Sequence, residues 1–214
     1  MILLDWLHFL HSPEGLQQII TTAGLSALIA IVFAETGLLL GFFLPGDSLL
    51  VTAGILSSST LTGGEPVLDY WVTVLALMLA AMIGNQVGFF LGHKTGPKIF
   101  KREDNRFFKK KYVEEAQAFY HRHGGLAIMM AQFVPIMRTF VPFVAGVAQM
   151  VYPRFISYNV VGAIIWVFSM VSLGHFVGKT PLGEKIHLVI LTVIFVSVLP
   201  LFISVIRRFL KPKL

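Results

Sequence analysis

The sequence predicts an all-α integral membrane protein, an inverted repeat of two opposed re-entrant helical hairpins, each followed by a transmembrane helix, plus a C-terminal transmembrane helix. Three observations predict this fold class. Hydrophobic residues make up 56% of the chain and charged residues only 13%, too few for the surface of a soluble domain. Three apolar runs are long enough to cross a bilayer. Two further apolar stretches, one in each half, are interrupted by Pro and Gly and contain ionisable residues.

The three uninterrupted runs are 71–92, 155–178 and 188–206. Each holds ~20 residues without Lys, Arg, Asp or Glu, which is the length a helix needs to cross the hydrocarbon core. We predict a transmembrane helix for each. The first residues of the chain have no basic region, so we do not expect a cleaved signal peptide.

Charge is distributed very unevenly along the chain. All 17 Lys and Arg residues occur from Lys94 onward, and basic loops stay on the cytoplasmic side of membranes. Segment 94–123 is therefore predicted to be a basic cytoplasmic loop containing an interfacial helix at 107–121, and the basic C-terminus is predicted to be cytoplasmic. Beside membrane spans, the basic cluster is a topology signal, so no nucleic-acid binding is expected.

The sides of the membrane assigned to the flanking regions determine the predicted course of the two interrupted stretches. Segment 125–151 lies between two cytoplasmic regions, so it is predicted to be an inner re-entrant hairpin with breaks at Pro135 and Pro142. Segment 16–60 is too long for one span, and Pro45 divides it into two arms. These arms form either two full spans or an outer re-entrant hairpin, and both alternatives place the N-terminus outside. A single span followed by a hairpin would place it inside, and we rank that alternative lower.

Three ionisable residues in these stretches are the candidates for chemistry, because charge within the hydrocarbon is costly. They are Glu35, Asp47 and Arg138. With two acids and one base, at least one carboxylate lacks a full cationic partner, and both desolvation and a like charge favour its protonated form. We hypothesise that Glu35 or Asp47 carries a proton. In the alternative, Arg138 only neutralises an acid and holds the two halves together.

The guanidinium of Arg138 is a permanently charged fork suited to a phosphate, which favours an anionic or zwitterionic phosphate headgroup as cargo. Helices starting after Pro45-Gly46 and near Arg138 could aim their N-termini at the same anion. The other residues predicted to line this binding site are Gly46, Ser48, Asn85, Gln132 and Thr139.

One motif offers an enzymatic alternative. Residues 46–49 (GDSL) match the opening block of a type of serine hydrolase, in which the Ser needs a base from a later Asp-x-x-His. No Asp occurs after Asp104, so we do not expect an enzyme. The chain has no Cys, no convincing histidine metal site and no phosphate-binding glycine loop, so neither a metal nor another cofactor is predicted.

Together with Glu35, residues 43–50 (FLPGDSLL) and 133–146 (FVPIMRTFVPFVAG) resemble the DedA family of bacterial inner-membrane proteins. The resemblance extends over nearly the whole chain. It implies a lipid transporter, a flippase or scramblase linked to the proton motive force, with undecaprenyl phosphate as the leading cargo. It also implies a fold with two opposed re-entrant hairpins, with the family's essential acids at Glu35 and Asp47 and its second essential arginine at Arg138.

Two positions depart from the family pattern. Gln132 stands where the family usually has its first Arg, and Asn85 stands where some relatives carry Asp. We therefore expect a less cationic site, in which Gln132 still donates hydrogen bonds. The expected partners are membrane lipids and protons, and a homodimer is one open oligomeric state. The functional alternatives are scrambling without ion coupling and a membrane assembly or regulatory factor that transports nothing.

Overall fold

The computed structural model describes residues 13–38, 46–58, 66–101, 125–181 and 192. Every regular element in these ranges is a helix, which confirms the all-α prediction for the described part of the chain. The helices are α2 (Pro13–Gly37), α3 (Gly46–Leu56), α4 (Tyr70–Lys101), α6 (Leu126–Ala131), α7 (Pro135–Val147) and α8 (Tyr152–Gly178).

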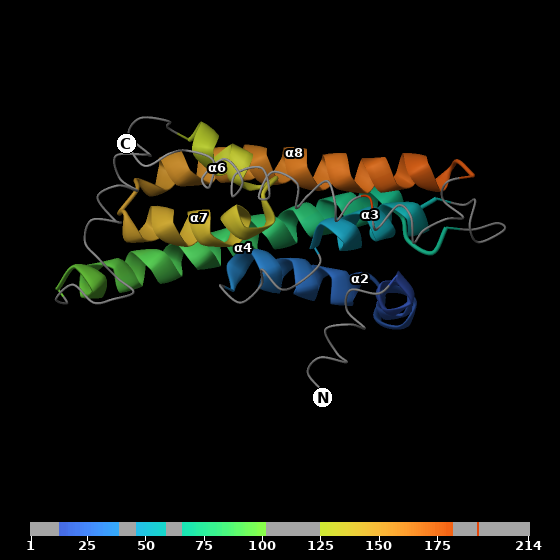
Figure 1. Cartoon of the computed structure of the whole chain (residues 1–214), viewed down its shortest axis with the longest axis horizontal. Helices are drawn as coiled ribbons and strands as arrows, with labels where there is room; N and C mark the ends of the chain where they lie inside the picture. The colour runs from blue at the N-terminus through green and yellow to red at the C-terminus, as the bar shows by residue number, and fades with distance from the viewer. Residues whose placement is uncertain (1–12, 39–45, 59–65, 102–124, 182–191, 193–214) are drawn as a thin grey trace, which may run out of the picture.

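The two long helices α4 and α8 run along the length of the molecule (Figure 1). Tyr70–Gly96 and Tyr152–Gly178 are each 27 residues long and apolar enough to cross a membrane, and they cover the runs predicted at 71–92 and 155–178. The third predicted span, 188–206, lies outside the described residues apart from residue 192.

Residues 94–101, predicted as the start of the basic loop, are helical, because helix α4 continues to Lys101. Helix α4 packs against α7, also near this end. A Cβ atom on Gly96 of α4 would lie 2.9 Å from the carbonyl oxygen of Val147 in α7. The rest of the predicted loop, with its interfacial helix at 107–121, lies outside the described residues.

The stretch predicted at 16–60 contains two arms. Helix α2 changes direction at Gly24, whose φ of 62° is readily adopted only by glycine, and Figure 1 shows its first part end-on. The apolar arms Gly24–Gly37 and Gly46–Leu56 are both shorter than the ~20 residues needed to cross the hydrocarbon alone. Pro45 lies outside the described residues, and the re-entrant course of this stretch stays a prediction.

The stretch predicted at 125–151 also contains two helices. Helix α6 ends at Ala131, Val134 is extended, and Pro135 begins α7 at a position where its missing N–H costs nothing. Pro142, however, was predicted as a second break and lies inside α7. It removes one helical hydrogen bond, a loss that membrane helices tolerate where neighbours surround them. Pro142 is buried, and α7 packs along α4.

The two halves of the chain pack in matching ways. Helix α3 lies along α8, and α7 lies along α4 (Figure 1). A Cβ on Gly54 of α3 would lie 2.1 Å from the carbonyl oxygen of Val171, and a Cβ on Gly146 of α7 would lie 2.0 Å from that of Phe89. At both contacts, therefore, the backbones approach so closely that only glycine fits.

The two long helices also share a sequence motif. Leu-Gly-His-x-x-Gly occurs at 91–96 in α4 and again at 173–178 in α8. Each long helix also begins with a tyrosine whose hydroxyl reaches the other: Tyr70 to Ser172 Oγ at 2.7 Å, and Tyr152 to Gln86 Oε1 at 2.7 Å. One hydrophobic cluster lies between α2, α3, α4 and α8, around the fully buried Trp166, and a second lies between α4, α6, α7 and α8.

Candidate functional site

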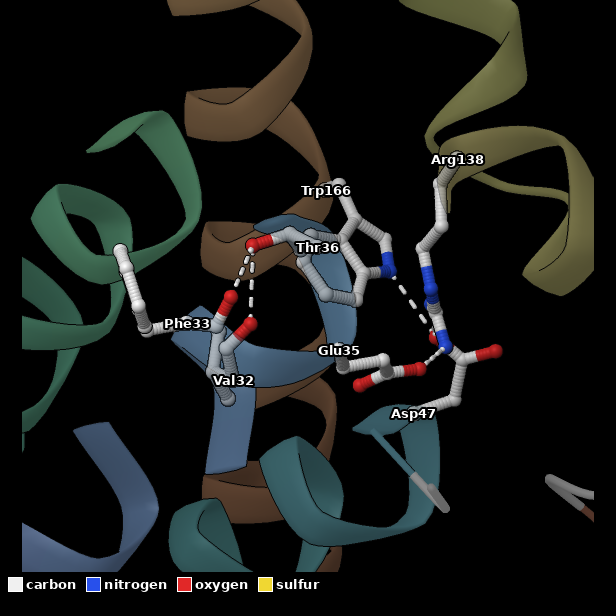
Figure 2. A network of polar contacts seen from close by, with 7 residues as sticks. All are labelled: Val32, Phe33, Glu35, Thr36, Asp47, Arg138 and Trp166. Atoms are coloured by element: carbon white, nitrogen blue, oxygen red, sulfur yellow. Dashed lines mark hydrogen bonds and ion pairs between the residues drawn. The ribbon is translucent and has the colours of Figure 1, made fainter. Parts of the chain in front are cut away.

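The three charged residues singled out in the sequence meet in one cluster, which we call the triad. Arg138 of α7 donates through Nη1 to Asp47 Oδ1 of α3 and through Nη2 to Glu35 Oε1 of α2 (Figure 2). All three are buried, with 1% of Arg138, 1% of Glu35 and 6% of Asp47 exposed. One guanidinium therefore bridges two carboxylates that come from the other half of the chain.

The starts of two helices position these groups. Helix α3 begins at Gly46 and places Asp47 in its first turn, and α7 begins at Pro135 and places Arg138 in its first turn. Gly46 leaves room for Glu35, because a Cβ there would lie 1.6 Å from Glu35 Oε2. The carboxylate of Glu35 thus lies at the positive N-terminus of α3, the place where the sequence predicts a bound anion.

Trp166 of α8 is a triad contact that sequence reasoning missed. Its indole Nε1 donates to Asp47 Oδ1 at 3.0 Å, and the Cζ atom of Arg138 lies 4.6 Å from the centre of its ring (Figure 2). The ring therefore stabilises the cation through its face while the N–H stabilises an acid. The available signal was a tryptophan in the middle of a predicted span, where its N–H needs an acceptor.

The charges of the triad do not balance. If all three groups are ionised, the triad carries a net charge of about −1, and each terminal guanidinium nitrogen donates to one carboxylate. In this arrangement an external anion meets repulsion and must compete with two carboxylates for the guanidinium. Protonation of either carboxylate changes both conditions, because it removes a negative charge and weakens one hydrogen bond to Arg138.

Most of the other predicted site residues lie beside the triad. Gly46 and Ser48 flank Asp47 in the first turn of α3, Thr139 follows Arg138 in α7, and all three are buried. Asn85 and Gln132 instead belong to a neighbouring group of buried amides that includes Asn159 of α8. Asn85 Nδ2 donates to Asn159 Oδ1 at 2.7 Å. Sequence reasoning missed Asn159, an uncharged polar residue within a predicted span.

Comparison with known proteins supplies independent information. The VTT domain matches residues 44–176, a range that includes Asp47, Arg138 and Trp166. Protein DedA of Escherichia coli strain K12 is 38% identical over 210 residues, which cover 96% of this chain and 93% of that protein. The chain belongs to the DedA family of membrane proteins.

Two further relatives match at similar levels. An uncharacterized membrane protein of Mycobacterium tuberculosis is 42% identical over 194 residues, covering 90% of this chain and 83% of the relative. Inner membrane protein YqjA of Escherichia coli is 34% identical over 158 residues, covering 74% and 69%. No solved structure matches the chain.

Proposed function

We propose that this protein is a lipid transporter, a flippase or scramblase, that moves a phosphate-bearing lipid across the bacterial inner membrane with proton coupling. Undecaprenyl phosphate is the first candidate cargo, as the family resemblance implies. The observation that carries the proposal is the buried Arg138, shared between Glu35 and Asp47. The inner membrane is proposed because YqjA is named as a protein of that membrane.

Competition for one guanidinium explains how protons couple to the cargo. When both carboxylates are ionised, they hold Arg138 and repel an anion. When one is protonated, its claim on Arg138 weakens and a phosphate can take the released nitrogen. Arginine suits this role because its fork binds phosphate bidentately and stays charged throughout the cycle. Proton and phosphate therefore enter the site together, which is the basis of coupled transport.

The position of Glu35 supports phosphate as the anion. Its carboxylate contacts both Arg138 and the start of α3, so it occupies a place suited to an anion. A phosphate bound there would replace Glu35 on the guanidinium and meet the same helix N-terminus. Glu35 is therefore the group that we expect to take the proton and withdraw when cargo binds.

Vesicles reconstituted with the protein and a fluorescent polyprenyl phosphate test the proposal. We expect flux that rises with a pH gradient and is lost in Arg138→Lys, which keeps the charge but not the fork. Arg154→Lys, the same change at an exposed arginine, is the matched control and should keep wild-type flux. Equal flux with and without the gradient would indicate scrambling without proton coupling. No flux of any lipid would favour an assembly or regulatory factor.

A further inference from the structure

The group of buried amides beside the triad is incomplete as it stands. Asn85 and Asn159 are 0% exposed and Gln132 is 1% exposed. Asn159 uses both ends of its amide, because Oδ1 accepts from Asn85 and Nδ2 donates to the Met82 carbonyl oxygen at 3.3 Å. Among the described residues, however, Asn85 Oδ1 and Gln132 Oε1 have no hydrogen-bond partner. The Asn85 amide cannot be turned end for end, because its Oδ1 would then face Asn159 Oδ1, a second acceptor.

The amide group and the triad share one face of α8. Asn159, Gly162 and Trp166 recur every three or four residues, so they lie along one side of the helix. Gln132 is at the level of Gly162, because a Cβ there would lie 3.1 Å from Gln132 Cγ. Trp166, one turn further along, contacts Asp47 and the guanidinium. At 1.5 Å per residue, Asn159 and Trp166 are only ~10 Å apart along the helix axis.

Helix α4 also packs against α2 at the level of the triad. A Cβ on Gly84 would lie 2.1 Å from Thr36 Oγ1, so the residue before Asn85 packs against the residue after Glu35. Glu35 is also buried, and its carboxylate interacts with the backbone of Gly46 at the start of α3. Within the described part of the chain, the charged groups facing Glu35 are Arg138 from α7 and Asp47 from α3.

The chemistry of the unpaired atoms indicates what completes the group. Among the described residues, Asn85 Oδ1 and Gln132 Oε1 are both acceptors, so the missing partner of the amides must donate hydrogen bonds. Arg138 Nε is an unpaired donor, but it belongs to the triad and not to the amide group. A phosphate offers mainly further acceptors and fits this set poorly. Water is a small donor that typically makes about three hydrogen bonds to otherwise unsatisfied buried groups.

A polar contact also lies on the far side of the amides. Gln86, next to Asn85, accepts a hydrogen bond from Tyr152 at the first residue of α8, and both side chains are half-buried. The stacked rings of Phe89 and Phe155, with centroids 4.3 Å apart, occupy the neighbouring turns of the same two helices. Polar groups thus extend from the triad toward the Tyr152 end of α8, with an aromatic pair beside them.

We propose that Asn85, Asn159 and Gln132 hold ordered water, which carries protons between the triad carboxylates and the Tyr152 end of α8. This inference rests on the proposed function, because it names the route of the coupling proton. Asn159 is a positioning residue that fixes Asn85, while Asn85 and Gln132 contact the water through their unpaired oxygens. Phe89 and Phe155 restrict access from the Tyr152 end.

Trp166 provides a probe that does not depend on lipid movement, because it touches both Asp47 and Arg138. Full-length protein carrying Trp6→Phe and Trp71→Phe is placed in vesicles of determined orientation, and the pH is stepped on one side. We expect Trp166 emission to respond faster when the step is made on the Tyr152 side. Asn85→Leu and Gln132→Leu should slow that response at least about tenfold and leave its end point unchanged, because a relay through water needs each link.

Two further variants keep the test decisive. Ser157→Leu, a polar-to-leucine change on the exposed surface of α8, should respond at the wild-type rate. Asn85→Ser keeps a group that can donate to Asn159 Oδ1 and accept from water, and should stay within about twofold of wild type, which covers the case in which a leucine variant does not fold. An unslowed response in folded leucine variants, a slow response of Asn85→Ser, or no response of Trp166 to pH would overturn the inference.

The readouts separate this inference from the proposed function. If Trp166 responds through the amides but vesicles show no lipid flux, the water route stands and the transport proposal fails. If flux depends on the pH gradient but the leucine variants leave the Trp166 response unslowed, only the water route fails.

Discussion

The two halves of this molecule pack alike but carry opposite charge. Helix α3 of the first half contacts α8 of the second half through Gly54. Helix α7 of the second half contacts α4 of the first half through Gly146, and both contacts are at backbone contact distance. The first half supplies the carboxylates Glu35 and Asp47, whereas the second supplies Arg138. Because the acids and the arginine come from different halves, neither half contains a complete site. The triad forms only where the two halves meet.

Removing the cation of the triad should have the largest effect. Arg138→Met leaves two carboxylates buried without their partner, a loss that typically costs about 3–5 kcal/mol. We expect a large fall in thermal stability in detergent together with complete loss of lipid flux. Arg154→Met, at an exposed position, serves as the control. Wild-type stability of Arg138→Met would contradict the view that the triad holds the halves together.

Adding one methyl group tests whether the packing of the halves is equivalent. Gly54→Ala and Gly146→Ala each force a Cβ to about 2 Å from a carbonyl oxygen, and such overpacking typically costs about 1–3 kcal/mol. Both should lower the unfolding temperature by similar amounts. At Gly88, a Cβ would meet its nearest atom at an ordinary 3.6 Å, so Gly88→Ala is the matched control. A large effect in only one half would show that the two contacts are not equivalent.

Trp166 contacts triad residues from both halves, and its substitution should have the smallest effect. Trp166→Phe keeps an aromatic face toward Arg138 but removes the N–H bonded to Asp47, which costs about 1 kcal/mol as one net hydrogen bond. We expect a modest loss of stability and flux that depends less steeply on pH. Trp71→Phe, at an exposed tryptophan of α4, provides the control. A Trp166→Phe protein with the pH dependence of wild type would remove Trp166 from the site.

Much of this arrangement could be predicted from the sequence, because its strongest signals are local. Long uncharged runs predicted α4 and α8, and the cost of charge in hydrocarbon singled out Glu35, Asp47 and Arg138. The partners that complete the site could not be predicted, because they depend on which faces of different helices meet. Trp166 and Asn159 read as ordinary residues of an apolar helix until packing turns them toward α3, α7 and α4.

One sequence signal was interpreted too simply, and another was not used. Pro142 reads as a helix break, yet α7 continues through it because neighbouring helices surround this part of the structure. The repeated Leu-Gly-His-x-x-Gly of 91–96 and 173–178 would have indicated the match between the halves directly from the sequence. The opposed re-entry of the two hairpins stays a prediction, since it depends on where the bilayer lies.

The competition between carboxylate and phosphate for Arg138 is the central claim, and binding of a polyprenyl phosphate across pH tests it most directly. Wild-type protein should bind more tightly as pH falls, because protonation releases the guanidinium. Glu35→Gln removes one charged competitor, worth about 1.5 kcal/mol or more, so it should bind at least roughly tenfold tighter at high pH and with a flatter pH profile. Weaker binding by Glu35→Gln, or an unchanged pH profile, would contradict the account.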